Sequence, residues 1–165
     1  MEFGEYVAGH RHKLLRFATV LTCQTWLAED LVSDVLCRAF ERWDRISLMA
    51  EPNAYVRRMV VNEYLSWRRR LARTSPRADV EPDGALLSDG ADERAERDEM
   101  IRRLAGLPRR QRAAVVLRFY AGLPDAAIAA ELGCRETTVR SQISRALAAL
   151  RLDLTAAPRT PLETR

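Results

Sequence analysis

Apolar residues recur at three- and four-residue spacing along most of the chain, and no segment shows a sustained two-residue alternation. This periodicity predicts amphipathic helices without a sheet, so the expected fold class is all-α. In the first half, the apolar stripes predict helices over about 2–22, 27–43 and 52–73, the last beginning at Pro52. His10 falls on the first stripe, and we interpret it as a helix-lining residue, not as a metal ligand.

The segment 125–150 predicts two short helices joined by a tight turn, which is a helix-turn-helix. Gly133 lies where the first of these helices needs a left-handed residue to end. The second helix buries an apolar stripe, and its opposite face is short, polar and basic. Such a face can read the major groove, although a helical hairpin with a solvated charged face would give the same pattern. The outward residues are Thr137, Arg140, Ser141, Ser144 and Arg151.

The helix expected over 52–73 also separates into two faces. Its apolar side carries Val56, Val60 and Tyr64. Arginine and asparagine on the other side can follow phosphates and hydrogen-bond to base edges, whereas the alternative is a solvated charged surface. The polar side consists of Arg58, Asn62, Ser66, Arg69 and Arg73.

Charge divides the chain into three parts. Six arginines oppose one acid over 53–74, nine acids face three arginines over 75–99, and ten arginines oppose three acids over 101–151. Because the acidic part also contains prolines and glycines, it predicts a flexible linker between two small helical domains that face nucleic acid. The positive charge is almost all arginine, since Lys13 is the single lysine, and arginine favours phosphate and base contacts.

Several classes of function are excluded by what the sequence lacks. Cys23, Cys37 and Cys134 are odd in number and far apart, which predicts buried small apolar residues and neither a disulfide framework nor a metal site. No phosphate-binding loop and no nucleophile with a base is present, so we expect no enzyme activity and no cofactor. The chain also lacks a membrane-spanning apolar run and a signal peptide, so we expect a cytoplasmic protein without membrane insertion.

Three blocks in this order closely resemble the bacterial extracytoplasmic-function (ECF) RNA polymerase sigma factors of the SigE-like actinobacterial type. They are EDLVSDVLCRAFERWDRI, PNAYVRRMVVNEYLSWRRR and LPRRQRAAVVLRFYAGLPDAAIAAELGCRETTVRSQISRALAALR. The resemblance spans nearly the whole chain. It implies sigma region 2, a three-helix-type bundle, over 1–74, the acidic linker over 75–95, the helix-turn-helix of sigma region 4 over 96–152, and a tail over 153–165.

The implied function is to bind core RNA polymerase and to direct promoter recognition, DNA melting and transcription initiation. On the second helix, the resemblance assigns Asp30, Asp34 and Arg38 to the polymerase-docking surface, although Asp34 and Arg38 could instead form only an intrahelical ion pair. Contacts with the −10 element are implied for Arg58, Asn62, Ser66 and Arg69. Contacts with the −35 element are implied for Arg118, Arg135, Thr137, Thr138, Arg140, Ser141, Ser144 and Arg145.

The implied partners are the clamp helices and the flap of core RNA polymerase, promoter DNA, and an anti-sigma factor. Two other classes stay open at this point. One is a helix-turn-helix transcriptional regulator that binds DNA without being a polymerase subunit, and the other is a helical adaptor that binds only protein. The acidic linker could imitate nascent RNA in the polymerase channels, or it could be a solubilising tether.

Overall fold

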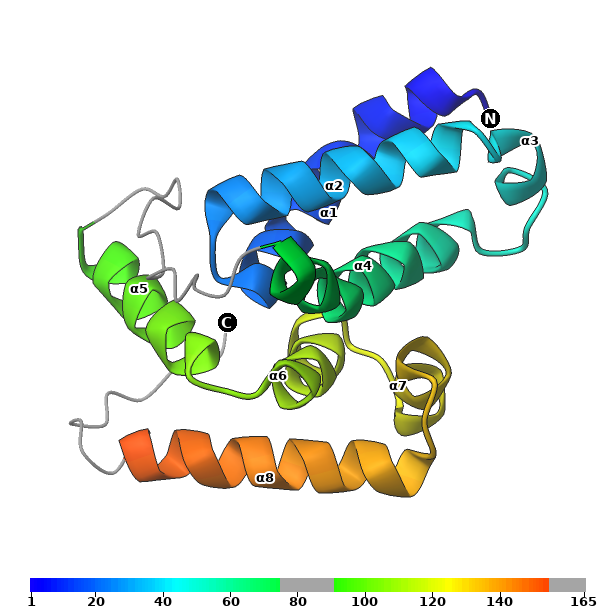
Figure 1. The fold of residues 1–165 in the computed structure, drawn as a ribbon. Helices are drawn as coiled ribbons and strands as arrows, with labels where there is room; N and C mark the ends of the chain where they lie inside the picture. Colours follow the sequence, from blue (N-terminus) through cyan, green and yellow to red (C-terminus); the bar gives the residue numbers. More distant parts are fainter. Residues whose placement is uncertain (75–90, 155–165) are drawn as a thin grey trace, which may run out of the picture.

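The computed structural model describes residues 1–74 and 91–154, with side chains described over 1–66 and 95–151. Within these ranges every regular element is a helix, which confirms the all-α prediction (Figure 1). Most of the expected acidic linker, over 75–90, and the tail over 155–165 lie outside the described residues. In chain order the helices are α1 (Phe3–Thr22), α2 (Thr25–Phe40), α3 (Trp43–Ile46), α4 (Pro52–Thr74), α5 (Ala91–Ala105), α6 (Arg109–Val115), η1 (Val116–Tyr120), α7 (Asp125–Leu132) and α8 (Glu136–Leu154).

The first domain is built on α1 and α2, which lie side by side, with α4 packed against both (Figure 1). Helix α1 ends because Cys23 adopts the left-handed conformation, with φ 60°, and its N–H donates to the Thr19 carbonyl at 2.8 Å. None of the described helices is both long enough and apolar enough to cross a membrane.

The helix expected over 27–43 is shorter than the pattern predicts. Helix α2 stops at Phe40, and the chain turns before the short α3 starts at Trp43. The apolar period predicts that Phe40 and Trp43 both point inward from this helix. For Phe40 this prediction is wrong, because the turn leaves 64% of the residue exposed, while Trp43 is buried as expected. The Phe40 ring instead lies at the edge of the bundle, 5.1 Å from the ring of Phe3.

The second domain contains the predicted helix-turn-helix, formed by α7 and α8. Gly133 has φ 61°, and the Cys134 N–H donates to the Ala129 carbonyl at 3.0 Å, which closes the end of α7. Ahead of this motif, α6 continues directly into η1, a single wider π-helical turn that carries Arg118. Helix α5 begins at Ala91, inside the segment expected as the linker, so the exact domain limits stay a prediction.

The two domains share one hydrophobic core, although the sequence predicts modules that are separated by a linker. Leu117 and Ile128 of the second domain are buried in the same cluster as Val56 and Val60 of α4. An ion pair closes this contact, with Nη2 of Arg57 2.6 Å from Oε1 of the buried Glu131.

A buried arginine also joins the domains. The Arg112 side chain donates through Nη1 to the carbonyls of Leu21 and Thr22, each at 3.3 Å. It donates through Nη2 to the carbonyls of Ala105, at 2.8 Å, and Leu107, at 3.3 Å. Since the last carbonyls of a helix have no partner inside it, one guanidinium serves the carboxyl ends of both α1 and α5.

The cysteine prediction holds only in part. Cys23 is buried in an apolar cluster with Leu104 and Leu107, as expected. Cys134 is half-buried, and Cys37 is exposed, so the prediction of a buried Cys37 is wrong. Cys37 follows Leu36 on α2, one position past the inward stripe, and a step of about 100° carries it to the outer surface.

Candidate nucleic-acid interface

The second helix of the helix-turn-helix, α8, presents the expected polar and basic face. The apolar residues Val139, Ile143 and Ala146 are buried against α6 and α7. On the opposite side, Arg135, Thr137, Arg140, Ser144 and Arg145 are exposed, and Thr138 and Ser141 are half-buried. The face analysis of the sequence is therefore right that Thr137, Arg140, Ser144 and Arg151 are exposed, whereas Ser141 is partly covered. Exposure is a precondition for contact with DNA.

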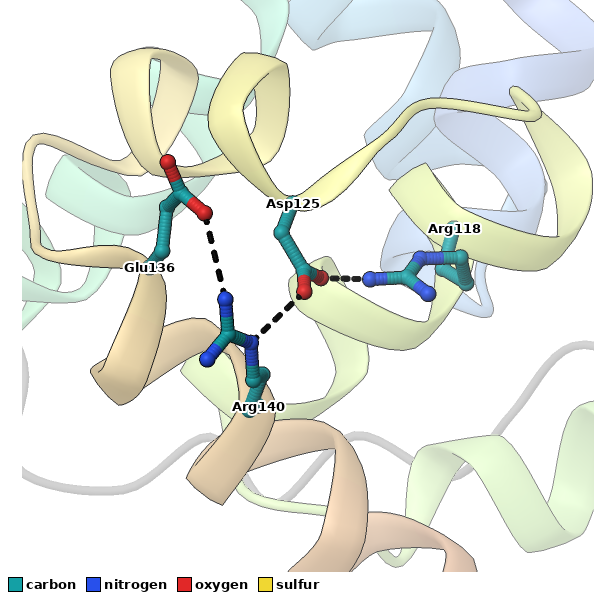
Figure 2. Close-up of polar contacts among 4 residues, drawn as sticks. All are labelled: Arg118, Asp125, Glu136 and Arg140. Carbon is teal, nitrogen blue, oxygen red and sulfur yellow. Dashed lines mark hydrogen bonds and ion pairs between the residues drawn. The ribbon is translucent and has the colours of Figure 1, made fainter.

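Two of the arginines on this surface are held by carboxylates (Figure 2). Asp125, the first residue of α7, forms an ion pair through Oδ1 with Nη2 of Arg118, which comes from η1. Its other oxygen, Oδ2, accepts from Nε of Arg140 at 3.0 Å. Glu136 accepts from Nη2 of Arg140 at 3.3 Å, across one turn of α8. The network thus links η1, α7 and α8 at the outer surface.

A groove with a net positive charge lies beside this network. Its walls carry three arginines and one carboxylate, so it suits an anionic group such as a phosphate. The residues that line it are Arg118, Asp125, Arg140, Ile143, Ser144, Leu147, Ala148 and Arg151.

In the first domain, α4 carries a second polar face. Arg58 and Asn62 are exposed, one turn apart, while Ser66 is half-buried and donates its hydroxyl to the Glu63 carbonyl at 3.0 Å. The side chain of Arg69 lies outside the described residues, although its backbone continues α4. The structure therefore brings Arg58 and Asn62 together on one surface and turns Ser66 partly toward its own helix.

The outer face of α2 carries the residues that the resemblance assigns to polymerase docking. Asp30 and Asp34 are exposed. Arg38 is partly covered and turns to the buried Glu63 of α4, with Nη2 2.6 Å from Oε2. Its Nε also donates to the backbone carbonyl of Asp34, at 3.3 Å. Arg38 therefore ties α2 to α4 as well as bordering the acidic surface.

Sequence reasoning missed the carboxylates that organise these arginines. Glu136 and Arg140 are four residues apart on one helix, so their pairing could have been found from spacing alone. Asp125 and Arg140 lie on different helices, and Glu63 lies 25 positions after Arg38. Those two pairs depend on how the helices pack, which periodicity does not encode.

A basic recognition helix, a second polar helix and no strand in the described residues define a two-domain helical DNA-binding protein. The family model described as Sigma-70 region 2 matches residues 6–74, and the model described as Sigma-70, region 4, matches residues 97–150. These are the two classes of domain that the sequence analysis expected.

Relatives along the full length refine this class. The chain is 35% identical over 154 residues to the RNA polymerase sigma-E factor of Streptomyces avermitilis, covering 93% of this chain and 86% of that one. It is 32% identical to the ECF RNA polymerase sigma factor SigL of Mycobacterium tuberculosis, covering 88% and 84%. The chain belongs to the extracytoplasmic-function family of RNA polymerase sigma factors.

Solved structures agree with this assignment. The sigma factor RpoE of Bartonella quintana, crystallised with the anti-sigma factor NepR, superimposes with a TM-score of 0.77 and 25% identity, covering 94% of this chain and 98% of that one. CnrH, solved with the cytosolic domain of CnrY, has the same fold, with a TM-score of 0.64 and 24% identity, covering 94% and 89%. The protein is therefore a transcription initiation factor that binds core RNA polymerase and directs it to promoters, and it is not a free-standing helix-turn-helix regulator.

Proposed function

We propose that the two domains of this sigma factor divide the promoter between them, with 1–74 at the −10 element and 96–152 at the −35 element. The observation that carries this proposal is the exposed polar and basic face of α8, bordered by Arg118 on η1. An exposed row of Thr, Ser and Arg on the second helix of a helix-turn-helix has the chemistry needed in the major groove.

Within the second domain, we divide the outward residues into base contacts and phosphate contacts. The side chain of Arg140 is 63% exposed, on the side of α8 next to Asp125, so its guanidinium can reach a base edge. The expected base contacts are Thr137, Arg140, Ser141 and Ser144. The expected phosphate and flanking contacts are Arg118, Arg135, Thr138 and Arg145.

Within the first domain, we assign the −10 element to the polar face of α4. Exposed Arg58 and Asn62 lie one turn apart, which suits one phosphate contact beside one base contact. Half-buried Ser66 continues this face toward the end of the helix, and Arg69, whose side chain lies outside the described residues, is included because the resemblance implies it. DNA melting requires an unstacked base to be held, at a cost of a few kcal/mol that these contacts must offset.

The acidic outer face of α2 is the proposed docking surface for core polymerase. Exposed Asp30 and Asp34 would pair with basic residues of the polymerase clamp helices. Arg38 would act at the border of this surface, where its ion pair with Glu63 links α2 to α4. The polymerase flap would bind the second domain.

We further propose that the chain performs no chemistry itself, acts in the cytoplasm, and is restrained by an anti-sigma factor. The relative RpoE was crystallised with the anti-sigma factor NepR, which supports a proteinaceous inhibitor. For the acidic linker, an assay of abortive and full-length transcripts distinguishes imitation of nascent RNA from a solubilising role. Neutralising Asp79, Glu81, Asp83 and Asp89 changes the ratio of abortive to full-length transcripts only in the first case.

The division of the promoter is tested by DNA binding and run-off transcription with purified core polymerase. Arg140→Ala should cost about 1–3 kcal/mol at the −35 element, and Asn62→Ala should reduce promoter opening while leaving −35 binding intact. The double change Asp30→Ala and Asp34→Ala should weaken core binding without affecting the fold. If Arg140→Ala transcribes every promoter in a randomised library as the wild type does, the −35 assignment is wrong.

A further inference from the structure

We propose that Asp125 is a positioning residue that makes the recognition surface selective, by restraining Arg118 and Arg140 and by repelling non-target DNA. This inference rests on the proposed −35 contacts of the two arginines. Asp125 is held at the first position of α7 and pairs with both of them, one through each carboxylate oxygen (Figure 2). Its side chain is 22% exposed, against 63% for Arg140, so it lies just beneath the surface that meets DNA.

The carboxylate lowers the attraction of this surface for any DNA backbone. An arginine that contacts a phosphate releases counterions, and this sequence-independent term supplies essentially all of non-specific binding. Asp125 offsets part of the positive charge of Arg118 and Arg140, and its own charge repels a phosphate that enters the groove. Both effects act against every DNA sequence.

Asp125 weakens binding less at a target site than at a non-target site. There, Arg140 can exchange its contacts with Asp125 and Glu136 for hydrogen bonds to a base edge, which a non-target sequence does not offer. Exposed ion pairs are weak, so this exchange is readily made when the new partner is well placed. An unfavourable group that acts mainly against the wrong partner raises specificity, even though it also weakens binding overall.

The carboxylate has a geometric effect as well. Asp125 comes from α7, Arg118 comes from η1 and Arg140 comes from α8, so one side chain ties together three elements of the motif. With Nε on Asp125 and Nη2 on Glu136, the Arg140 guanidinium is held beside the groove before DNA arrives. A side chain that is already restrained to this surface loses less conformational entropy on binding, even though the two ion pairs themselves are exchanged at a target site.

The test uses the full-length chain bound to core polymerase and two DNA duplexes. One is a promoter selected by transcription from a randomised library, and the other is the same duplex with a scrambled −35 element. Dissociation constants are measured by fluorescence anisotropy between 50 and 200 mM salt for Asp125→Asn, which removes the charge and keeps the shape. Glu96→Gln, at an exposed position of α5 far along the chain from the network, makes the same change of charge and is the matched control.

We expect Asp125→Asn to raise the affinity for the scrambled duplex by about 3- to 10-fold and to steepen its salt dependence by about one phosphate contact. Affinity for the promoter should rise by less than about twofold, so the selectivity ratio falls. Asp125→Glu, which keeps the charge, should restore a ratio close to that of the wild type, whereas a purely structural role for Asp125 would not produce this pattern. Glu96→Gln should shift both affinities equally, by less than about twofold.

Arg140→Ala separates a failure of the proposed −35 contact from a failure of the role proposed for Asp125. If this variant binds both duplexes as the wild type does, the proposed −35 contact itself fails. If Arg140→Ala loses discrimination, by about 5- to 150-fold, yet Asp125→Asn shifts both duplexes equally, changes neither, or weakens both, then only the role of Asp125 is overturned. Thermal unfolding is followed for each variant, and Asp125→Ser replaces Asp125→Asn in the same comparison if the latter does not fold.

Discussion

Arg112 is a charged side chain that is buried and hydrogen-bonded to backbone carbonyls. It is only 9% exposed and is surrounded by four backbone carbonyls that belong to the ends of α1 and α5. Burying a guanidinium is costly unless its donors are used, and here the two Nη atoms make two hydrogen bonds each. The sequence identifies Arg112 only as one of many arginines, because its partners are backbone atoms brought together by folding.

Replacing Arg112 therefore tests how much the carbonyl contacts stabilise the protein. Arg112→Met keeps much of the side-chain volume but leaves these carbonyls buried without a donor, so the free energy of unfolding should fall by about 2–4 kcal/mol. The free energy of unfolding of Arg112→Lys should lie between those of Arg112→Met and the wild type. Urea denaturation followed by circular dichroism measures both, with Arg110→Met at an exposed position as the control. A loss no larger than that of the control would mean that the carbonyls are satisfied in another way.

Tyr64 provides a prediction for alkaline pH. Burial raises the pKa of its phenol from the ordinary 10.0 to about 12, although the nearby charges of Arg112 and Arg109 oppose this shift. The unfolded chain then releases the phenol proton first, so this contribution to stability is complete below pH 10 and is lost as the pH rises toward 12. Tyr64→Phe should remove about 2 kcal/mol of that alkaline loss and leave stability at pH 7 unchanged or slightly higher, since no described residue hydrogen-bonds to the buried hydroxyl. Urea denaturation at pH 7 and at several values between pH 9 and 12 checks this, with Tyr55→Phe, at a half-buried position, as the matched variant.

At the scale of the element, period and turn chemistry predict much of what the structure contains. The helix-turn-helix follows from the stripe through Val139 and Ile143 and from Gly133, whose φ is the left-handed value that the turn requires. The break after Phe40 is missed because Trp43 restores the apolar period on the far side of the turn. Outward residues of the candidate site are likewise predictable from one helix at a time, whereas the ion pairs of Asp125 need three elements in their final arrangement.

Two glycine-to-alanine changes test whether the left-handed turn at Gly133 governs the end of α7. Gly133→Ala should lower the free energy of unfolding by about 1–2 kcal/mol, because a residue with a Cβ is strained at φ 61° even though open space surrounds the position. Gly9→Ala, in the interior of α1 and also in open space, should instead raise it by about 0.5–1 kcal/mol. Thermal and urea denaturation of the two variants give the comparison. Equal effects of the same sign would show that the left-handed turn does not govern the end of α7.

At the scale of the whole molecule, the sequence predicts each domain but not their contact. Arg57 and Glu131 lie 74 positions apart, and each looks like an ordinary solvated charge when only its own helix is considered. In the structure they pair beside a core to which both domains contribute. Another contact of this kind is made by Arg109, which donates to the Tyr64 carbonyl at 2.7 Å and lies over its ring.

This contact constrains how the protein can meet a promoter. A compact chain of this length has a radius of gyration of about 15 Å, whereas elements centred about 25 base pairs apart lie roughly 85 Å apart along straight DNA. If the domains occupy the −10 and −35 elements as proposed, they have to separate when the holoenzyme forms. Core polymerase then supplies the spacing, and binding of the second domain becomes effectively intramolecular.

Cys23 reports this separation directly. Its thiol is 2% exposed, in a cluster that it forms with residues of the second domain, and burial raises its pKa despite the nearby Arg112. In the free chain, alkylation followed by mass spectrometry should therefore modify the exposed Cys37 at least about tenfold faster than Cys23, because only an exposed thiolate reacts readily. Core polymerase should raise the rate at Cys23, and Arg57→Ala should raise it in the free chain by removing an ion pair between the domains. A Cys23 rate that neither polymerase nor Arg57→Ala changes would mean that the domains stay together and that one of them does not reach its proposed promoter element.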